Sequence, residues 1–507
     1  MKRKYPIVSL MLGAVLLAGC SAQSRTEASG SAGTEKAAAV TAENTITLSG
    51  SSASSGSENV SVDGGVITIT GAGTYELRGT LSDGMIIVSA GDEDDVNLVL
   101  NGADITSSAS AAIYVANCGD ATVTLADGSE NSLSNGGTFT AVDESNIDAV
   151  IFSKEDLTLT GSGSLTIDSP AGHGVVSKDD LTVESGSYLV TAASHGMTGK
   201  DELLISGGDV TITAGKDGLH AKNDEDDSLG NLTVSGGSVT VTAADDGLHA
   251  SGDTVISAGT VTVTDSSEGI EGETITISGG AITVTAKDDG LNAAGGSDQS
   301  GAQSFFGGNP FEVDENAAIT ISGGTLYVNA DGDGIDSNGS ITMTGGQVFV
   351  SGPTNSGNGA LDYGTAASIT GGTIVAAGAS GMAENFSSAE NQGVMLVSTG
   401  AQSAGTAVTL TDESGAELVS WTPEKAYECV VISTPDVQQG GTYTLTAGSS
   451  SQTVTMTSAV YGGGMGMGQM GGMGGRGQMP QDGQMNGQMP QNGQMGGGPQ
   501  GGGMRRP

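Results

Sequence analysis

A short glycine motif recurs through the middle of the chain, and this repeat limits the possible folds more than any other feature. Its glycines are residues 174, 196, 218, 247, 269, 290 and 334, with spacings of 22, 22, 29, 22, 21 and 44. Between them lie runs of alternating Val, Ile, Leu and Thr around a Gly-Gly pair, as in LTVSGGSVTVTA at 232–243. Alternation with period two predicts strands, and Ser-Gly-Gly predicts a turn. Each unit therefore holds about three short strands, and such units must stack on one another.

These units predict an all-β fold, a parallel β-helix with coils of about 22 residues. The spacing of 44 corresponds to about two units and includes a Gly-, Ser- and Phe-rich stretch at 297–316. A leucine-rich repeat would need a fixed Leu and Asn pattern, and a propeller blade needs four strands in roughly 40 residues or more. A core of small branched side chains agrees with an aromatic content of only 3%. We place the β-helix at 45–395 and a small β module at 396–460.

The two ends of the chain differ from the repeats. Basic residues at 2–4 precede an apolar run at 7–18, and Leu-Ala-Gly-Cys follows at 17–20. This ending resembles a bacterial lipobox, in which the cysteine, here Cys20, is lipidated and begins the mature chain. The alternative is an ordinary secretory signal peptide with an incidental cysteine. Residues 21–44 are predicted to be a flexible linker, and the Gly-, Met- and Gln-rich residues 461–507 a disordered tail.

The charge excludes one class of partner. Lys and Arg number 16 against 58 Asp and Glu, which gives a net charge of −42. A general nucleic-acid binder needs cationic side chains to displace counterions, so we expect no nucleic-acid partner. The same charge opposes adhesion to anionic lipid, so membrane attachment would depend on the lipid anchor. Cys118 and Cys429, the two other cysteines, lie among apolar strand residues and are predicted to be buried thiols.

Acidic residues occupy equivalent positions in the turns of successive coils. Stacking would place neighbouring carboxylates about 4.8 Å apart, where each pair repels by roughly 3.5 kcal/mol at an effective dielectric of about 20. Such a stripe is tolerated only if it is exposed and screened, partly protonated, or bridged by cations. Calcium, which takes oxygen ligands, is the natural bridge outside a cell; the alternative is a set of solvated turns, since Asp-Gly suits turns by itself. The predicted calcium ligands are Asp217, Asp245, Asp246, Glu268, Glu271, Asp288, Asp289, Asp333 and Asp336.

All four histidines of the chain lie on the same turns. They are expected to stack in two pairs, His173 with His195 and His220 with His249. No cysteine or further histidine completes a zinc set, so we expect polar turn residues here.

Lysine and phenylalanine residues add candidate contacts for a ligand. Lys200 and Lys222 lie one coil apart beside the acidic stripe. They could form exposed ion pairs, contact an acidic substrate as point charges, or supply the base of a lyase, which would need a lowered pKa. Phe305, Phe306 and Phe311 lie in an inserted loop, where they could bind sugar or pack against the coils.

Four features of the sequence together resemble one known family. They are the lipobox, the stretch GTYELRGTLSDGMIIVSAGDEDDVNLVLNGADITSSASAAIYVAN at 73–117, LADGSENSL at 125–133, and the coils that contain DGLHA and DGLNA. This combination resembles the carbohydrate-binding β-helix domain of clostridial surface proteins over residues 45–395. The resemblance implies a right-handed, pectate-lyase-like β-helix, calcium in the acidic turns, and binding of cellulose or pectic polysaccharide without cleavage. The histidines at 173 and 195 and the Met-rich tail depart from that family's pattern.

Three functional hypotheses follow from these features. The first is a lipid-anchored, monomeric cell-surface protein that binds plant-type polysaccharide, cellulose or pectin, with Ca2+ as its cofactor and without catalysis. The second is a calcium-dependent polysaccharide lyase on the same scaffold. The third is a structural adhesin that uses the coils as a spacer.

Overall fold

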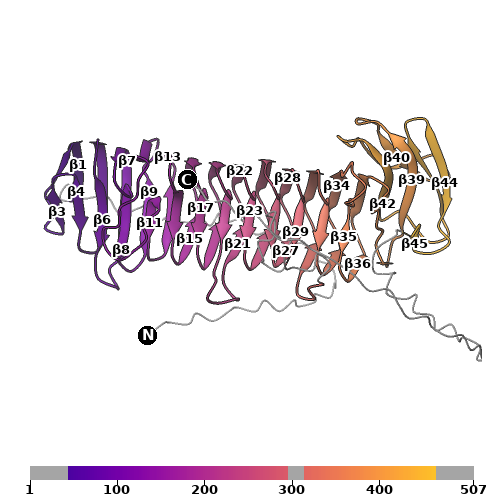
Figure 1. Cartoon of the computed structure of the whole chain (residues 1–507), viewed down its shortest axis with the longest axis horizontal. Helices are drawn as coiled ribbons and strands as arrows, with labels where there is room; N and C mark the ends of the chain where they lie inside the picture. Colours follow the sequence, from indigo (N-terminus) through magenta and orange to yellow (C-terminus); the bar gives the residue numbers. More distant parts are fainter. Residues whose placement is uncertain (1–43, 295–312, 464–507) are drawn as a thin grey trace, which may run out of the picture. The chain divides into compact units, whose positions relative to one another are not determined.

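The computed structural model describes residues 44–294 and 313–463, which form an all-β structure without an α-helix (Figure 1). Three sheets account for all of its strands, and the largest has 28. Its strands are β1 (Thr45–Gly50), β2 (Ser52–Ser55), β5 (Gly73–Leu81), β7 (Val96–Ser107), β9 (Ala121–Leu125), β10 (Glu130–Asn135), β12 (Leu157–Gly161), β13 (Ser164–Ser169), β15 (Asp180–Val183), β16 (Ser187–Ala192), β18 (Glu202–Ile205), β19 (Asp209–Ala214), β21 (Asn231–Val234), β22 (Ser238–Ala243), β24 (Asp253–Ile256), β25 (Thr260–Asp265), β27 (Thr274–Ile277), β28 (Ala281–Ala286), β30 (Ala318–Ile321), β31 (Thr325–Ala330), β33 (Ser340–Met343), β34 (Gln347–Ser351), β36 (Ala366–Ile369), β37 (Thr373–Gly378), β38 (Ser388–Ala389), β39 (Val394–Gln402), β42 (Tyr427–Ser433) and β45 (Val460–Tyr461).

The second sheet has 13 strands and the third has four. The 13-stranded sheet contains β3 (Val60–Asp63), β4 (Val66–Ile69), β6 (Met85–Ser89), β8 (Ile113–Asn117), β11 (Ala149–Ser153), β14 (His173–Ser177), β17 (Met197–Gly199), β20 (Leu219–Ala221), β23 (Leu248–Ala250), β26 (Ile270–Gly272), β29 (Leu291–Ala293), β32 (Ile335–Ser337) and β35 (Asp362–Tyr363). The four-stranded sheet contains β40 (Val408–Thr411), β41 (Glu417–Trp421), β43 (Thr442–Ala447) and β44 (Ser450–Thr455).

Each regular coil contributes two strands to the 28-stranded sheet and one short strand to the 13-stranded sheet. In the coil that begins at β18, the strands β18, β19 and β20 pair in parallel with β21, β22 and β23 of the next coil. Within β19, Val210 and Ile212 point into the core, each 1% exposed. The predicted stacking of coils through parallel strands is therefore confirmed, and the alternating pattern explains which side chains form the core.

One interval was interpreted wrongly from the sequence. Strand β29 pairs directly with β32, with Leu291 opposite Ile335. The interval of 44 residues is therefore a single coil with an inserted segment. Strand pairing shows which coils are neighbours, whereas the number of residues between two strands does not.

The repeated glycines are required by the close approach of successive coils. A Cβ atom on Gly218 would lie 2.2 Å from Cγ1 of Val241 and 2.7 Å from the carbonyl oxygen of Gly247. In the Gly-Gly turn, the second glycine has a positive φ, for example +73° at Gly237. Both positions therefore exclude a side chain, one for lack of space and the other for backbone conformation.

The parallel coils end in antiparallel strands. Strand β37 pairs antiparallel with β42, which also pairs antiparallel with β39, and the four-stranded sheet is antiparallel throughout. A second core, which includes Phe349, Tyr427 and Leu445, lies at this end. The pairing of β42 thus occupies the edge of β37 that another coil would otherwise take.

Cys118 and Cys429 are buried and free, as predicted. The predictions for Cys20, the linker before residue 44, the three phenylalanines of the inserted loop and most of the C-terminal tail lie outside the described residues. Among the described residues, no helix is long and apolar enough to span a membrane.

Candidate functional site

A row of polar and ionisable side chains crosses successive strands of the 13-stranded sheet, close to where each short strand begins. We call it the acidic row: Asp217, His220, Asp245, Asp246, His249, Glu268, Glu271, Asp288, Asp289, Asn292, Asp333 and Asp336. Some members lie in the turn before each short strand, and the others are the middle residue of that strand. In β20, Leu219 and Ala221 are both 0% exposed and face the core, so the middle residue, His220, must point the other way.

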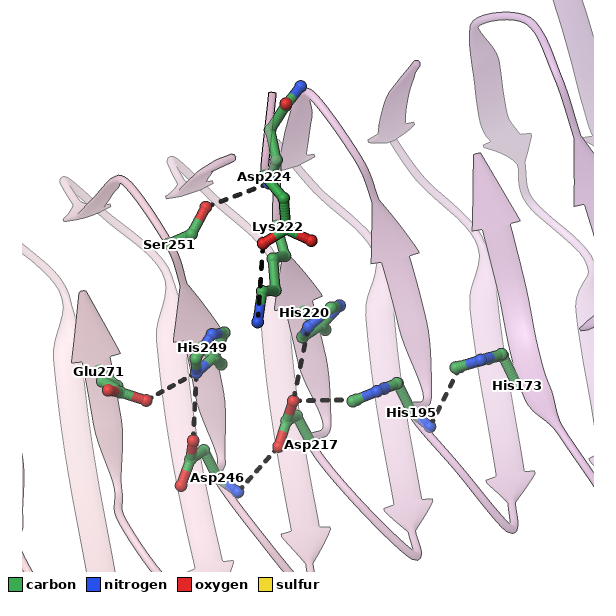
Figure 2. A network of polar contacts seen from close by, with 11 residues as sticks. His173, His195, Asp217, His220, Lys222, Asp224, Asp246, His249, Ser251 and Glu271 are labelled. Carbon is green, nitrogen blue, oxygen red and sulfur yellow. Dashed lines mark hydrogen bonds and ion pairs between the residues drawn. The ribbon is translucent and has the colours of Figure 1, made fainter. Parts of the chain in front are cut away.

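The four imidazoles form one continuous stack (Figure 2). Neighbouring ring centroids lie 4.9 Å apart for His173 and His195, 4.1 Å for His195 and His220, and 5.3 Å for His220 and His249. The sequence predicted the first and last contacts but not the middle one, because His195 and His220 occupy different positions in their coils. Asp217 lies beside both, with Oδ2 2.9 Å from Nδ1 of His195 and 3.8 Å from Nε2 of His220.

The stacking limits what the imidazoles can bind. Burial, and after it the neighbouring His195, lowers the pKa of His173 to about 3 and that of His220 well below its ordinary value. The rings of His195 and His220 are within 20° of parallel. Nitrogen lone pairs lie in the ring planes, so those of two stacked rings cannot converge on one metal ion. The structure therefore offers these two histidines as polar neighbours of Asp217, not as a chelating pair.

His249 lies between two buried carboxylates. Its Nδ1 is 2.6 Å from Oε2 of Glu271 and 3.2 Å from Oδ2 of Asp246, and the three side chains are between 2% and 4% exposed. Burial alone would lower the pKa of His249, but the two hydrogen bonds outweigh it and raise the pKa to about 10. The two carboxylates therefore favour the protonated form of His249, while burial raises the pKa of Asp246 itself.

Further along the row, burial raises the pKa of two more carboxylates. Burial, followed by the charges of Glu271 and Asp246, raises the pKa of Glu268 to about 9. Burial and Asp333 raise the pKa of Asp289 to about 8. Repulsion within the acidic row could be relieved by exposure to solvent, by protonation or by a bound cation. Exposure does not apply to Glu268, which is only 3% exposed. Protonation or a bound cation must then stabilise this part of the row.

The row brings carboxylates together in two groups of three. One consists of Asp217, Asp245 and Asp246, and the other of Asp289, Asp333 and Asp336. In each, one oxygen from every residue lies within 4.8 Å of the others. Ligands of one Ca2+ ion lie 2.3–2.6 Å from it, so oxygens separated by up to about 5 Å can share the ion.

Other members of the row are held differently. Glu271 belongs with Asp246 and His249, Glu268 accepts a hydrogen bond from Nδ2 of Asn292 at 2.7 Å, and Asp288 is exposed. Within the described part of the chain, Oδ1 of Asp246 is buried and has no hydrogen-bond partner. An unpaired buried carboxylate oxygen fits a site that takes a cation.

The two candidate lysines form ion pairs. Nζ of Lys200 is 2.8 Å from Oε2 of Glu225. Nζ of Lys222 is 3.9 Å from Oδ1 of Asp224 (Figure 2). The hydrogen bond to Glu225 raises the pKa of Lys200, whereas a lysine base needs a lowered pKa.

The row extends beyond the residues found from the sequence. Oδ2 of Asp148 lies 3.8 Å from Nε2 of His173. At the other end Asp362 pairs in register with Asp336, and burial followed by Asp362 raises the pKa of Glu384 to about 7. These residues lack the repeated Asp-Gly pattern, so only the register between coils could have identified them.

Comparison with known proteins gives one family and two relatives. A family described as "Carbohydrate-binding domain-containing protein" matches residues 63–305. A protein of Acetivibrio thermocellus with the same description is 34% identical over 137 residues, which are 27% of this chain and 48% of that protein. The chain therefore matches about half of the length of this relative. A solved structure, a polysaccharide lyase-like protein from C. thermocellum in a gadolinium derivative, is 29% identical, covers 47% of this chain and 92% of its own, and has a TM-score of 0.42.

Proposed function

We propose that this protein binds polysaccharide at the cell surface, without cleaving it, and that calcium ions in the acidic row support the binding. The observation that carries the proposal is the match of residues 63–305 to a family described by carbohydrate binding. The matched residues include the coils that contain the histidine stack and the first group of three carboxylates. The plant-type polymers cellulose and pectic acid are the ligands that we propose.

We propose a right-handed winding for the coils. Parallel strands of one sheet that are joined by a crossover connection are almost always right-handed, because strands twist in that sense. The parallel pairs β16–β19 and β19–β22 each have such a crossover connection, which passes through a short strand of the 13-stranded sheet.

Calcium in the row is proposed from the chemistry of its side chains. Asp217, Asp245 and Asp246 would supply oxygens to one ion, and Asp289, Asp333 and Asp336 to another. The remaining acidic members, Glu268, Glu271 and Asp288, would add charge nearby. When bound, calcium supplies positive charge that stabilises ionised carboxylates in a buried setting. The side chains of this protein orient those carboxylates, and His249 neutralises part of the charge between the two groups.

Calcium also explains how an acidic protein could bind an acidic glycan. With a net charge of −42, direct attraction to pectic acid is opposed by repulsion. An ion held between protein and sugar carboxylates would reverse this repulsion locally. The ion-paired state of Lys200 gives no support to a lyase base, so the proposal contains no catalytic step.

Attachment to the cell is proposed through lipidation of Cys20. The lipobox-like sequence at 17–20 supports it, and the net charge of −42 leaves no other attraction to anionic lipid.

A retention assay on insoluble pectic acid and cellulose tests the function. We expect retention on both, with a chelator abolishing retention on pectic acid only. Asp289→Asn, which keeps the shape of the side chain but removes its charge, should weaken pectic binding. Asp209→Asn, an exposed acidic residue of β19 outside the row, is the matched control and should have no effect. A folded protein that is retained on neither polymer would contradict the proposal and favour a structural adhesin.

A further inference from the structure

One outward-facing column of the 28-stranded sheet changes from threonine to aromatic residues towards its C-terminal end. Parallel register places Thr240, Thr262 and Thr283 of β22, β25 and β28 in line with Tyr327 of β31 and Phe349 of β34. Side chains in such a column project from the same face of the sheet, spaced by about 4.8 Å. The column therefore forms a regular surface across successive coils, of which β22, β28 and β34 are labelled in Figure 1.

The aromatic part of the column is a stack with one exposed end. The rings of Tyr327 and Phe349 are 5.1 Å apart and within 14° of parallel, and Trp421 of β41 lies 5.5 Å beyond Phe349. Phe349 is 7% exposed and packs in the C-terminal core, whereas Tyr327 is 43% exposed. Phe349 and Trp421 are accounted for by packing, but the exposure of Tyr327 is not.

The exposed ring stands at a step in the surface. Strand β31 lies between β28 and β34, so Phe349 covers one face of the Tyr327 ring and the opposite face is directed over Thr283. Threonine is much shorter than tyrosine, and Thr283 is itself exposed. The result is an aromatic wall, the ring of Tyr327, beside a lower floor of threonine side chains, which continues through the half-buried Thr262 and Thr240.

We propose that this step binds one pyranose ring of a neutral polysaccharide. The apolar C–H face of the sugar would lie on the open face of Tyr327, and its hydroxyls would exchange hydrogen bonds with Thr283 and Thr262. This inference rests on the proposed function and identifies a surface and a ligand class for it.

Charge favours a neutral glycan over a uronate at this step. The column from Thr240 to Phe349 contains no ionisable group apart from the phenol, on a protein of net charge −42. At the ends of these strands Nζ of Lys287 lies 2.8 Å from Oδ1 of Asp265 and Nζ of Lys425 2.6 Å from Oδ1 of Asp331. The carboxylate of Glu424 accepts a hydrogen bond from Asn329 of β31. A carboxylated sugar would have to compete with Asp265 and Asp331 for these lysines, whereas a neutral sugar needs no cation.

The test replaces the aromatic residue of the step by threonine. Tyr327→Thr installs the residue that the three preceding strands carry at this position, so strand pairing and folding should be preserved. Binding of cellohexaose would be measured by calorimetry and retention on insoluble cellulose by pull-down. We expect Tyr327→Thr to weaken both at least about tenfold, while calcium-dependent retention on pectic acid stays unchanged. The matched control is Leu189→Thr, which removes an exposed apolar side chain of β16 that is 50% exposed and lies further along the same column.

The outcomes separate this inference from the proposed function. Equal cellohexaose binding by the wild type and a folded Tyr327→Thr variant would overturn the site. Binding of pectic acid without any binding of cellohexaose or cellulose would also overturn it, yet would leave the proposed function standing. Loss of binding in Leu189→Thr to the same extent would show that Tyr327 is not the wall of the site. A wild type that binds none of the three would refute both.

Discussion

Replacing Glu268 by glutamine should stabilise the protein when divalent cations are absent. Glu268 is 3% exposed, and its Oε2 accepts a hydrogen bond from Nδ2 of Asn292 at 2.7 Å. Glutamine has the same shape, and its amide oxygen can accept the same hydrogen bond. The substitution therefore removes the ionisable group and leaves the packing in place.

The magnitude follows from the difference in pKa between the folded and unfolded states. Burial, followed by the charges of Glu271 and Asp246, raises the pKa of Glu268 from the ordinary value of 4.5 to about 9. Between these values the folded protein holds a proton that the unfolded chain releases, so the free energy of unfolding falls as the pH rises. Each pH unit in this window costs about 1.4 kcal/mol, which amounts to roughly 3 kcal/mol at pH 7. Glu268→Gln should restore most of this energy at pH 7 and almost none near pH 4.5.

Urea unfolding in the presence of a chelator, at several pH values, measures the effect. Glu184→Gln, which changes an exposed glutamate of a turn, is the control and should alter stability little at any pH. Saturating calcium should reduce the advantage of Glu268→Gln, because a bound cation stabilises the ionised row of the wild type. A Glu268→Gln variant that is no more stable than the wild type at pH 8 with chelator would refute the reasoning.

The other predictions concern the cation, the packing and the anchor. Millimolar calcium should raise the melting temperature relative to chelator, and Asp246→Asn should lose part of that shift; identical midpoints in calcium and chelator would argue against a bound ion. Gly218→Ala should lower the free energy of unfolding by about 2 kcal/mol, because its Cβ would lie 2.2 Å from Val241; unfolding in urea checks this, and an unchanged midpoint would show that the coils can separate. Cys20→Ala should release the protein from cells into the medium, as measured by fractionation; a variant that stays with the membrane would exclude this anchor.

The sequence alone determined the repeating part of the fold. In each unit, alternation of apolar residues identified the strands, and the spacing near 22 residues identified their partners one coil away, for example Val190 opposite Ile212. This succeeded because a solenoid makes contacts only between neighbouring units, so that local sequence carries nearly all of the information. For the same reason the sequence could identify the members of the acidic row from Asp217 to Asp336 as neighbours.

The tertiary structure decided what the repeat could not encode. The burial of Asp246 and Glu271 around His249 depends on side chains from different coils, and the contact of His195 with His220 joins two different positions of the repeat. The interval between Gly290 and Gly334 spans one coil and not two, because an insertion changes the length of the chain without changing the strand pairing. Most clearly, Trp421 joins the aromatic stack only because the chain reverses direction and β42 pairs antiparallel with β37. Such a contact is distant in sequence and aperiodic, so no repeat predicts it, and only the folded chain brings these residues together.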